Sequence, residues 1–136
     1  MAGRFQTYAE FWPYYLAEHS RPATRLLHVL GTGLALVLLA AGMVTAEPLL
    51  VLLAVVSGYL FAWIGHFAVE RNRPATFTHP WWSLVSDWRM FFLFLGGRLD
   101  AELRRHGIPA GRTAAAERPS SPGTGRHASP GAERRP

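Results

Sequence analysis

Residues 26–69 read LLHVLGTGLALVLLAAGMVTAEPLLVLLAVVSGYLFAWIGHFAV, and this stretch decides the fold. Glu47 divides it into two uncharged runs, one of 21 residues after Arg25 and one of 22 residues before Glu70. Each run is long enough to cross a hydrocarbon core of about 30 Å as an α-helix. A chain of 136 residues has too little other material to cover two such helices on all sides. We therefore predict two transmembrane helices in an all-α integral membrane protein.

Residues 46–48 alone connect the two expected helices, which predicts a tight antiparallel hairpin. Arginines stand at the opposite ends of both runs, at Arg21, Arg25, Arg71 and Arg73. Because positive charge stays on the cytoplasmic side, we expect the hairpin loop outside and both termini in the cytoplasm of a bacterial inner membrane. Small residues should let the two helices approach closely, namely Gly31, Ala35, Gly58, Ala62 and Gly65.

The segments on either side of the hairpin are expected to lie in the membrane interface. Residues 5–15 are rich in Phe, Trp and Tyr, which predicts an interfacial helix broken near Pro13. Residues 81–105 predict one further helix that lies in the interface or inserts partway, because its apolar run is too short to span. Residues 1–106 would then form the helical membrane domain, and the Pro- and Gly-rich residues 107–136 a disordered tail.

The composition excludes several classes of function. All 14 basic residues are arginine, and five of them lie in the tail among small residues and prolines. A nucleic-acid-binding protein would instead carry them on a folded face among stacking aromatics, so we predict no nucleic-acid partner. The chain has no cysteine. Any metal must therefore be held by His, Asp or Glu side chains.

Four of the six histidines are predicted to meet at the cytoplasmic end of the hairpin. His28 lies just inside the charged start of the first run, and His66 just before the charged end of the second. With a rise of about 1.5 Å per residue, antiparallel helices bring both to a similar depth, roughly 5 Å inside the same boundary. His19 and His79 flank that boundary from the adjoining segments. We predict that these four histidines bind a metal ion.

Glu70 is the candidate catalytic residue beside this site. It follows Tyr59, Trp63 and His66 at intervals that place all four on one helical face. A carboxylate at the C-terminal end of a helix opposes the helix dipole and needs a local partner. We expect Glu70 either to support an imidazole or to ligate the metal directly.

Asn72 and Arg73 follow the second run and are candidate substrate-binding residues. Amide and guanidinium groups donate hydrogen bonds to carboxylates, and Arg can do so with two bonds at once. Both residues lie at the end of the hairpin where the histidines are expected.

Five strings of the sequence carry a resemblance to a known family. They are FWPYYLAEH at 11–19, RLLHVLGT at 25–32, WIGHFAVERNRPATF at 63–77, PWWSL at 80–84 and DWRMF at 87–91. The chain resembles the family of the fungal endoplasmic-reticulum 2-hydroxy-fatty-acid dioxygenase, whose many bacterial relatives were long grouped as a domain of unknown function. The resemblance covers roughly residues 5 to 99 and leaves out the tail.

This resemblance implies an iron(II)-dependent membrane dioxygenase that uses O₂ to shorten a 2-hydroxy fatty acid by one carbon, as in α-oxidation. By motif position, the required histidines correspond to His19, His28, His66 and His79. A shell of histidines alone departs from the arrangement of two histidines and one carboxylate that is common in non-haem oxygenases. Glu70 could therefore replace one histidine as a ligand.

Other classes of function remain open at this point. His28 and His66 at equal depth could be the axial ligands of a haem in a membrane electron carrier. The histidines could instead join helices by hydrogen bonds in a non-catalytic membrane protein. Membrane di-iron hydroxylases are disfavoured, because their family needs more histidine ligands than this chain offers.

Overall fold

The computed structural model describes residues 5–110, which contain helices and loops and no strand. The elements in chain order are α1 (Tyr8–Glu18), α2 (Pro22–Thr45), α3 (Pro48–Ile64), the π-helix η1 (Gly65–Glu70), the 3-10 helix η2 (Ala75–Phe77), α4 (Pro80–Leu95) and α5 (Leu99–Arg105). The predicted all-α class is confirmed. Ala110 is buried against the core, beyond the predicted domain end at residue 106, and the rest of the predicted tail lies outside the described residues.

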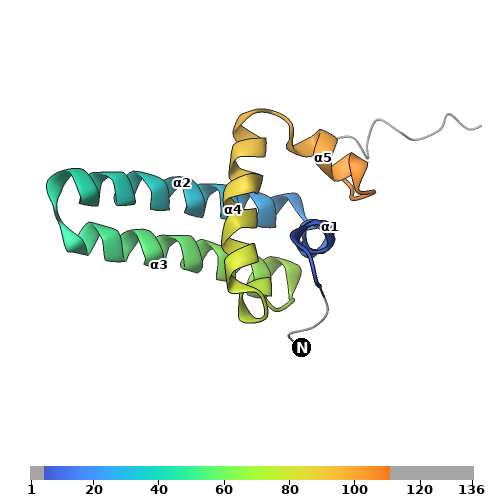
Figure 1. The fold of residues 1–136 in the computed structure, drawn as a ribbon, viewed down its shortest axis with the longest axis horizontal. Coiled ribbons are helices and arrows are strands. Elements are labelled where there is room, and N and C mark those ends of the chain that lie inside the picture. Colours follow the sequence, from blue (N-terminus) through green and yellow to red (C-terminus); the bar gives the residue numbers. More distant parts are fainter. Residues whose placement is uncertain (1–4, 111–136) are drawn as a thin grey trace, which may run out of the picture.

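Helices α2 and α3 form the predicted antiparallel hairpin and extend as a long arm (Figure 1). Each begins with a proline in its first turn, where the missing N–H costs no helical hydrogen bond. The backbone of Ala46 takes a left-handed conformation, with φ 55°, and its N–H donates to the carbonyl of Gly42. The stretches Pro22–Thr45 and Pro48–Glu70 are long and apolar enough to cross a membrane.

Small residues set the spacing inside this hairpin. A Cβ atom added to Gly31 would lie 2.6 Å from the Cβ of Phe61, and one added to Gly42 would lie 2.9 Å from Val51 Cγ2. At Gly65 the added atom would lie 3.1 Å from Thr24 Cγ2. The close approach predicted at Gly31 and Gly65 is therefore confirmed.

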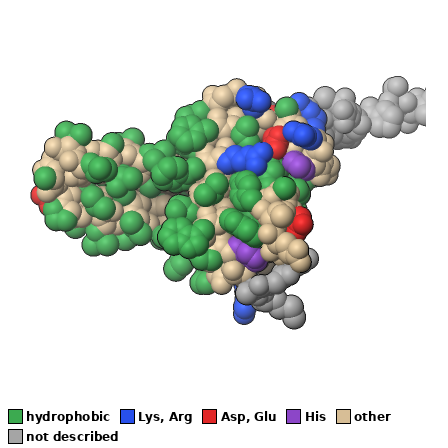
Figure 2. Space-filling view, viewed as in Figure 1, with side chains coloured by type: hydrophobic (Ala, Val, Ile, Leu, Met, Phe, Trp, Pro, Cys, Tyr) green, Lys and Arg blue, Asp and Glu red, His purple; other side chains and the backbone are tan. Residues whose placement is uncertain are grey.

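The remaining helices gather at one end of the arm. In Figure 1, α4 runs across α2 and α3, while α1 is seen end-on beside them. Figure 2 shows apolar side chains over most of the visible arm, with arginine and histidine side chains at the wide end. The molecule thus has an apolar arm, formed by most of α2 and α3, and a head with both polar and apolar side chains, formed by α1, α4, α5 and the adjoining end of the hairpin.

Helix α1 packs one of its faces into the core of this head. Its side chains Phe11, Trp12 and Tyr15 are at most 2% exposed and form the centre of the hydrophobic core. The same aromatic composition suits a membrane boundary and the interior of a small protein, and an interfacial position for α1 stays a prediction. The predicted break at Pro13 is wrong, since α1 continues through it. Packing on both sides of Pro13 holds the helix together despite the lost N–H.

The helix predicted over residues 81–105 is divided in two. Gly97 has φ 65°, a left-handed conformation that glycine adopts without strain and that ends α4. The chain then turns into α5, whose Leu99 and Leu103 are buried against α1. Glu102 of α5 accepts a hydrogen bond of 2.8 Å from the indole N–H of Trp12. Because of this break, the predicted single helix becomes α4 and α5, and both contribute side chains to the core around α1.

We expect Gly31→Ala to destabilise the hairpin. A methyl group at this position overlaps Phe61 Cβ, which cannot move without its backbone, and overpacking of this kind costs about 1–3 kcal/mol. Gly58→Ala is the matched control, because its added atom would meet only Ala35 at 3.8 Å. That variant should gain up to about 1 kcal/mol of helix propensity. Thermal unfolding in detergent measures both, and equal Tm values for the two variants would contradict the packing argument.

Candidate metal centre

Three buried histidines meet where α1, α2 and η1 come together. His19 follows α1 as its C-cap residue, His28 lies in α2 and His66 lies in η1. Their exposed fractions are 0%, 4% and 2%, and their donor nitrogens all lie within 4.8 Å of one another. The ring centroids are 4.3, 4.6 and 5.1 Å apart, with interplanar angles between 76° and 87°. The predicted convergence of His28 and His66 at one depth is confirmed.

Each imidazole is held by a hydrogen bond at its Nδ1 atom. The Nδ1 of His19 lies 2.6 Å from the carbonyl oxygen of Tyr15, and that of His28 lies 3.0 Å from Asp87 Oδ1. The Nδ1 of His66 lies 2.8 Å from Asn72 Oδ1. A carbonyl or carboxylate oxygen accepts only, so Nδ1 carries the proton in His19 and His28.

The orientation of the Asn72 amide extends the same assignment to His66. Asn72 Nδ2 donates to the carbonyl oxygen of Glu18 at 3.1 Å and to its carboxylate at 2.8 Å. The Oδ1 atom therefore faces His66 and accepts from its Nδ1–H. In their neutral form all three histidines therefore present an unprotonated Nε2 atom, which is the form that ligates metals.

The three imidazoles are placed to share a cation. Nε2 of His19 lies 3.1 Å from Nε2 of His28, and in the neutral tautomers that keep the proton on Nδ1 neither Nε2 atom carries one. Two facing lone pairs repel, whereas two nitrogens bound to one metal at about 2.1 Å lie roughly 3.0–3.4 Å apart. Burial lowers the pKa of His19 well below its usual value, and the neighbouring His28 and His66 lower it further. The residues therefore fit a metal ion held by neutral imidazoles.

Asp87 and Tyr15 complete the site and were not among the predicted residues. Asp87 Oδ1 accepts from His28 Nδ1 and also from the Tyr15 hydroxyl. Burial raises the pKa of Tyr15 well above its usual value, and the charge of Asp87 raises it further, so the hydroxyl keeps its proton. A carboxylate that accepts from a ligating histidine fixes the ring and raises its basicity. The sequence signal that could have identified Asp87 is that it is the one carboxylate in the largely apolar helix α4.

His79 lies outside the group of three. Among the described residues, the cluster of possible ligands consists of His19, His28 and His66. The loop after η1 places His79 at the N-cap of α4, where its ring stacks on Trp82 at 5.2 Å. Ring contacts connect it to His19 only by way of Phe11 and Tyr15. The predicted convergence of four histidines is thus reduced to three, because η2 turns the chain away from the site.

Glu70 is engaged at the start of α2. Its carboxylate accepts from the backbone N–H of Arg21 at 2.6 Å and from the Ser20 hydroxyl at 3.1 Å. It is not in the group of possible ligands. The π-helical turn of η1 shifts the residues after Gly65 around the axis, which moves Glu70 off the face expected from a regular α-helix. Its observed contacts satisfy unpaired N-terminal groups of α2.

The two predicted substrate-binding residues have different places. Asn72 is a positioning residue for His66, as its hydrogen bonds show. Arg73 is exposed, and substrate binding by it stays a prediction. Arg25, read from the sequence as a topology signal, is 5% exposed and donates to the carbonyl oxygens of His19 and Ser20. It thereby fixes the loop that carries His19.

Comparison with family models identifies the chain. Residues 5–99 match the model described as Mpo1-like, 2-hydroxy-palmitic acid dioxygenase. The chain belongs to this family. The match covers α1 to α4 and so includes every residue of the three-histidine site in this Mpo1-like protein. No curated protein and no solved structure matches the chain.

Replacing the histidines one at a time should separate ligands from neighbours. We expect His19→Ala, His28→Ala and His66→Ala each to lose bound metal, because each removes one of three ligands. His79→Ala should keep it, since that ring lies on Trp82. Elemental analysis of anaerobically purified protein measures the ratio of metal to protein, and circular dichroism checks that each variant is folded. Loss of metal from folded His79→Ala would return that residue to the ligand set.

Asp87→Asn tests the support of His28. The amide can still accept from Nδ1 but carries no charge, so metal affinity should fall about 10–100-fold. Asp100→Asn is the matched control, because Asp100 is exposed on α5 and is not in the ligand group. Competition with a chromophoric chelator measures both affinities. Equal affinities in the two variants would remove Asp87 from the site.

Proposed function

We propose that this protein is an iron(II)-dependent membrane dioxygenase that shortens 2-hydroxy fatty acids by one carbon. The observation that carries the proposal is the set of three buried imidazoles whose ring nitrogens converge, with the Nε2 atoms of His19 and His28 only 3.1 Å apart. Membership of the Mpo1-like family supplies the reaction class, because its description names a 2-hydroxy-palmitic acid dioxygenase. A lipid-like substrate and O₂ are the partners that this class requires.

His19, His28 and His66 would hold the iron in this proposal. Bound iron(II) would supply a redox centre with open positions for a 2-hydroxy carboxylate and O₂. The protein's own contribution is to hold three imidazoles in one tautomer before metal arrives, through Tyr15, Asp87 and Asn72. Hydrogen-bond partners of this kind tune ligand basicity and metal affinity. The overall reaction is balanced when one 2-hydroxy acid and one O₂ give the acid one carbon shorter, one carbon dioxide and one water.

The membrane is part of the proposal. We infer that α2 and α3 cross the bilayer, because they are long and apolar and because large side chains such as Val37, Met43 and Val44 are 66–87% exposed. Helix α4 crosses the base of the hairpin in Figure 1, so it would then lie close to the membrane surface. The arginines near this end favour the cytoplasmic side for the histidine site. Lipid-soluble substrates would reach the site from the bilayer.

A haem is less compatible with the geometry. Axial histidines bind opposite faces of a macrocycle, which must fit between their rings. His19 lies within 4.6 Å of both His28 and His66 by ring centroids, so it fills that space. A purely structural cluster is also disfavoured, because the Nδ1 hydrogen bonds of neutral His19 and His28 leave their two Nε2 lone pairs facing each other at 3.1 Å, whereas a metal ion would bind both.

Turnover by the purified protein tests the proposal. Protein reconstituted anaerobically with iron(II) should convert 2-hydroxypalmitic acid to the acid one carbon shorter when O₂ is admitted, and zinc-loaded protein should not. His66→Ala should lose turnover by at least about 100-fold, because it removes a ligand. His106→Ala is the control, since His106 contacts Glu102 and lies outside the cluster. Mass spectrometry of the product decides, and iron-loaded wild type without product would overturn the assignment.

A further inference from the structure

A cavity of about 290 Å³ opens beside the histidine site and runs along the arm. Its walls come from α2, α3, η2 and α4. His28 and Asp87 are the residues that it shares with the metal centre. The volume is near the lower end of the range for small-molecule sites. The cavity therefore reaches the edge of the three-histidine site at His28 and Asp87 and leads away from it.

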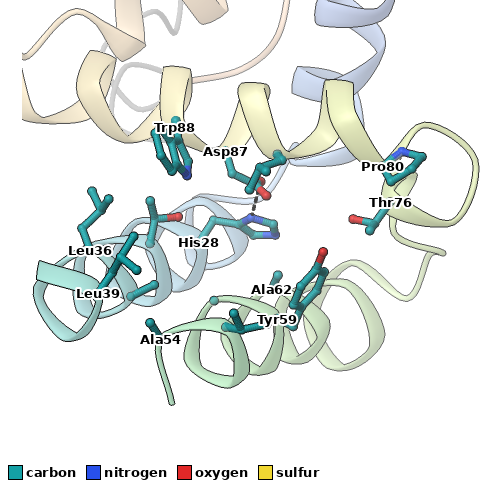
Figure 3. Close-up of a pocket in the computed structure, with 15 residues that line it drawn as sticks. His28, Leu36, Leu39, Ala54, Tyr59, Ala62, Thr76, Pro80, Asp87 and Trp88 are labelled. Atoms are coloured by element: carbon teal, nitrogen blue, oxygen red, sulfur yellow. Dashed lines mark hydrogen bonds and ion pairs between the residues drawn. The ribbon is translucent and has the colours of Figure 1, made fainter. Parts of the chain in front are cut away.

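The two ends of the cavity differ in polarity. Figure 3 shows the hydroxyls of Tyr59 and Thr76 on the side of the His28–Asp87 pair, with Leu36, Leu39 and Ala54 at the opposite end. A molecule that fits this gradient has a polar head and an unbranched apolar body. The order of the residues places the head at the histidine that belongs to the metal cluster.

The length of the apolar part fits one acyl chain. His28 and Leu39 are eleven residues apart on the regular helix α2, which corresponds to about 16 Å. This distance is roughly half of the ~30 Å hydrocarbon core, and one lipid chain fills that depth. Four wall residues, Val55, Tyr59, Leu84 and Trp88, are 43–54% exposed. The cavity is thus open along one side toward the region that we assign to the bilayer.

We propose that this cavity is an acyl-chain groove, in which Leu39 and Ala54 lie at the methyl end and set the preferred chain length. The inference rests on the proposed function for the identity of the head group. A chain that enters sideways from the bilayer would place its 2-hydroxy carboxylate at His28 and its methyl end near Leu39. Antiparallel packing brings Ala54 to the level of Leu39, so the two residues close the groove from opposite helices.

Chain-length preference tests the groove with the full-length protein. We expect Leu39→Trp to lower kcat/KM for 2-hydroxypalmitic acid by roughly tenfold, which corresponds to about two methylene groups left outside the groove. Turnover of 2-hydroxyoctanoic acid should be unchanged, because its shorter chain ends before Leu39. Leu34→Trp is the matched control, since Leu34 is 44% exposed on the same helix and does not line the cavity. An equal effect of both variants on both substrates would overturn the proposal.

A binding measurement separates this inference from the proposed reaction. A 2-hydroxypalmitic acid analogue with a diazirine at its methyl end is photolysed with metal-free protein in detergent, with and without excess 2-hydroxypalmitic acid. Labelling of Leu39, Ala54 or their neighbours in the cavity that is lost when excess 2-hydroxypalmitic acid is added supports the groove, whether or not the protein shows turnover. Labelling confined to lipid-facing residues outside the cavity, such as Val37, contradicts it even if the enzyme is active. Leu39→Trp should remove the displaceable label, whereas Leu34→Trp should keep it.

Discussion

Three imidazole lone pairs that face one another in a buried site are the constraint on which the rest of this structure depends. They remain in this arrangement because each Nδ1–H is committed to an oxygen acceptor. The acceptors come from three places in the chain, namely the carbonyl oxygen of Tyr15 in α1, the Asp87 carboxylate in α4 and the Asn72 amide after η1. The hairpin alone, with its extension η1, supplies two of the three imidazoles. Helices α1 and α4 are needed to supply the third and to prevent the other rings from turning.

The part of the site that could be predicted from sequence is the part that local geometry determines. Helical rise and the short loop placed His28 and His66 at one depth, and no other information was needed. The same reasoning fails at Glu70, because a π-helical turn begins at Gly65 and the sequence pattern gives no signal for it. It fails at His79 because the path of the loop through η2 depends on packing against α1. The place of a residue outside the two regular helices depends on tertiary contacts, and these cannot be read from the local sequence pattern.

The aromatic segment illustrates a second limit. Phe11, Trp12 and Tyr15 have a composition that suits a membrane interface, and only the position of α4 and α5 shows that they form a core. Asp87 was missed for the same reason, because its role depends on the contact between α4 and His28 of α2. Once α1 is recognised as buried, Tyr15 and Asp87 become a connected pair between the core and the metal centre. The contacts that hold the head together therefore also position the site.

The turn after η1 restricts how the length of this chain can vary. Arg71 has φ 59°, a left-handed conformation that is costly for a side chain with a Cβ. This turn lets Asn72 bind His66 twice, with its backbone N–H on the His66 carbonyl at 3.0 Å and its side chain on the ring. One residue more or fewer between them would rotate the two groups by about 100° and break both bonds. Insertions and deletions that preserve the centre belong in the distant hairpin loop, where added length costs little.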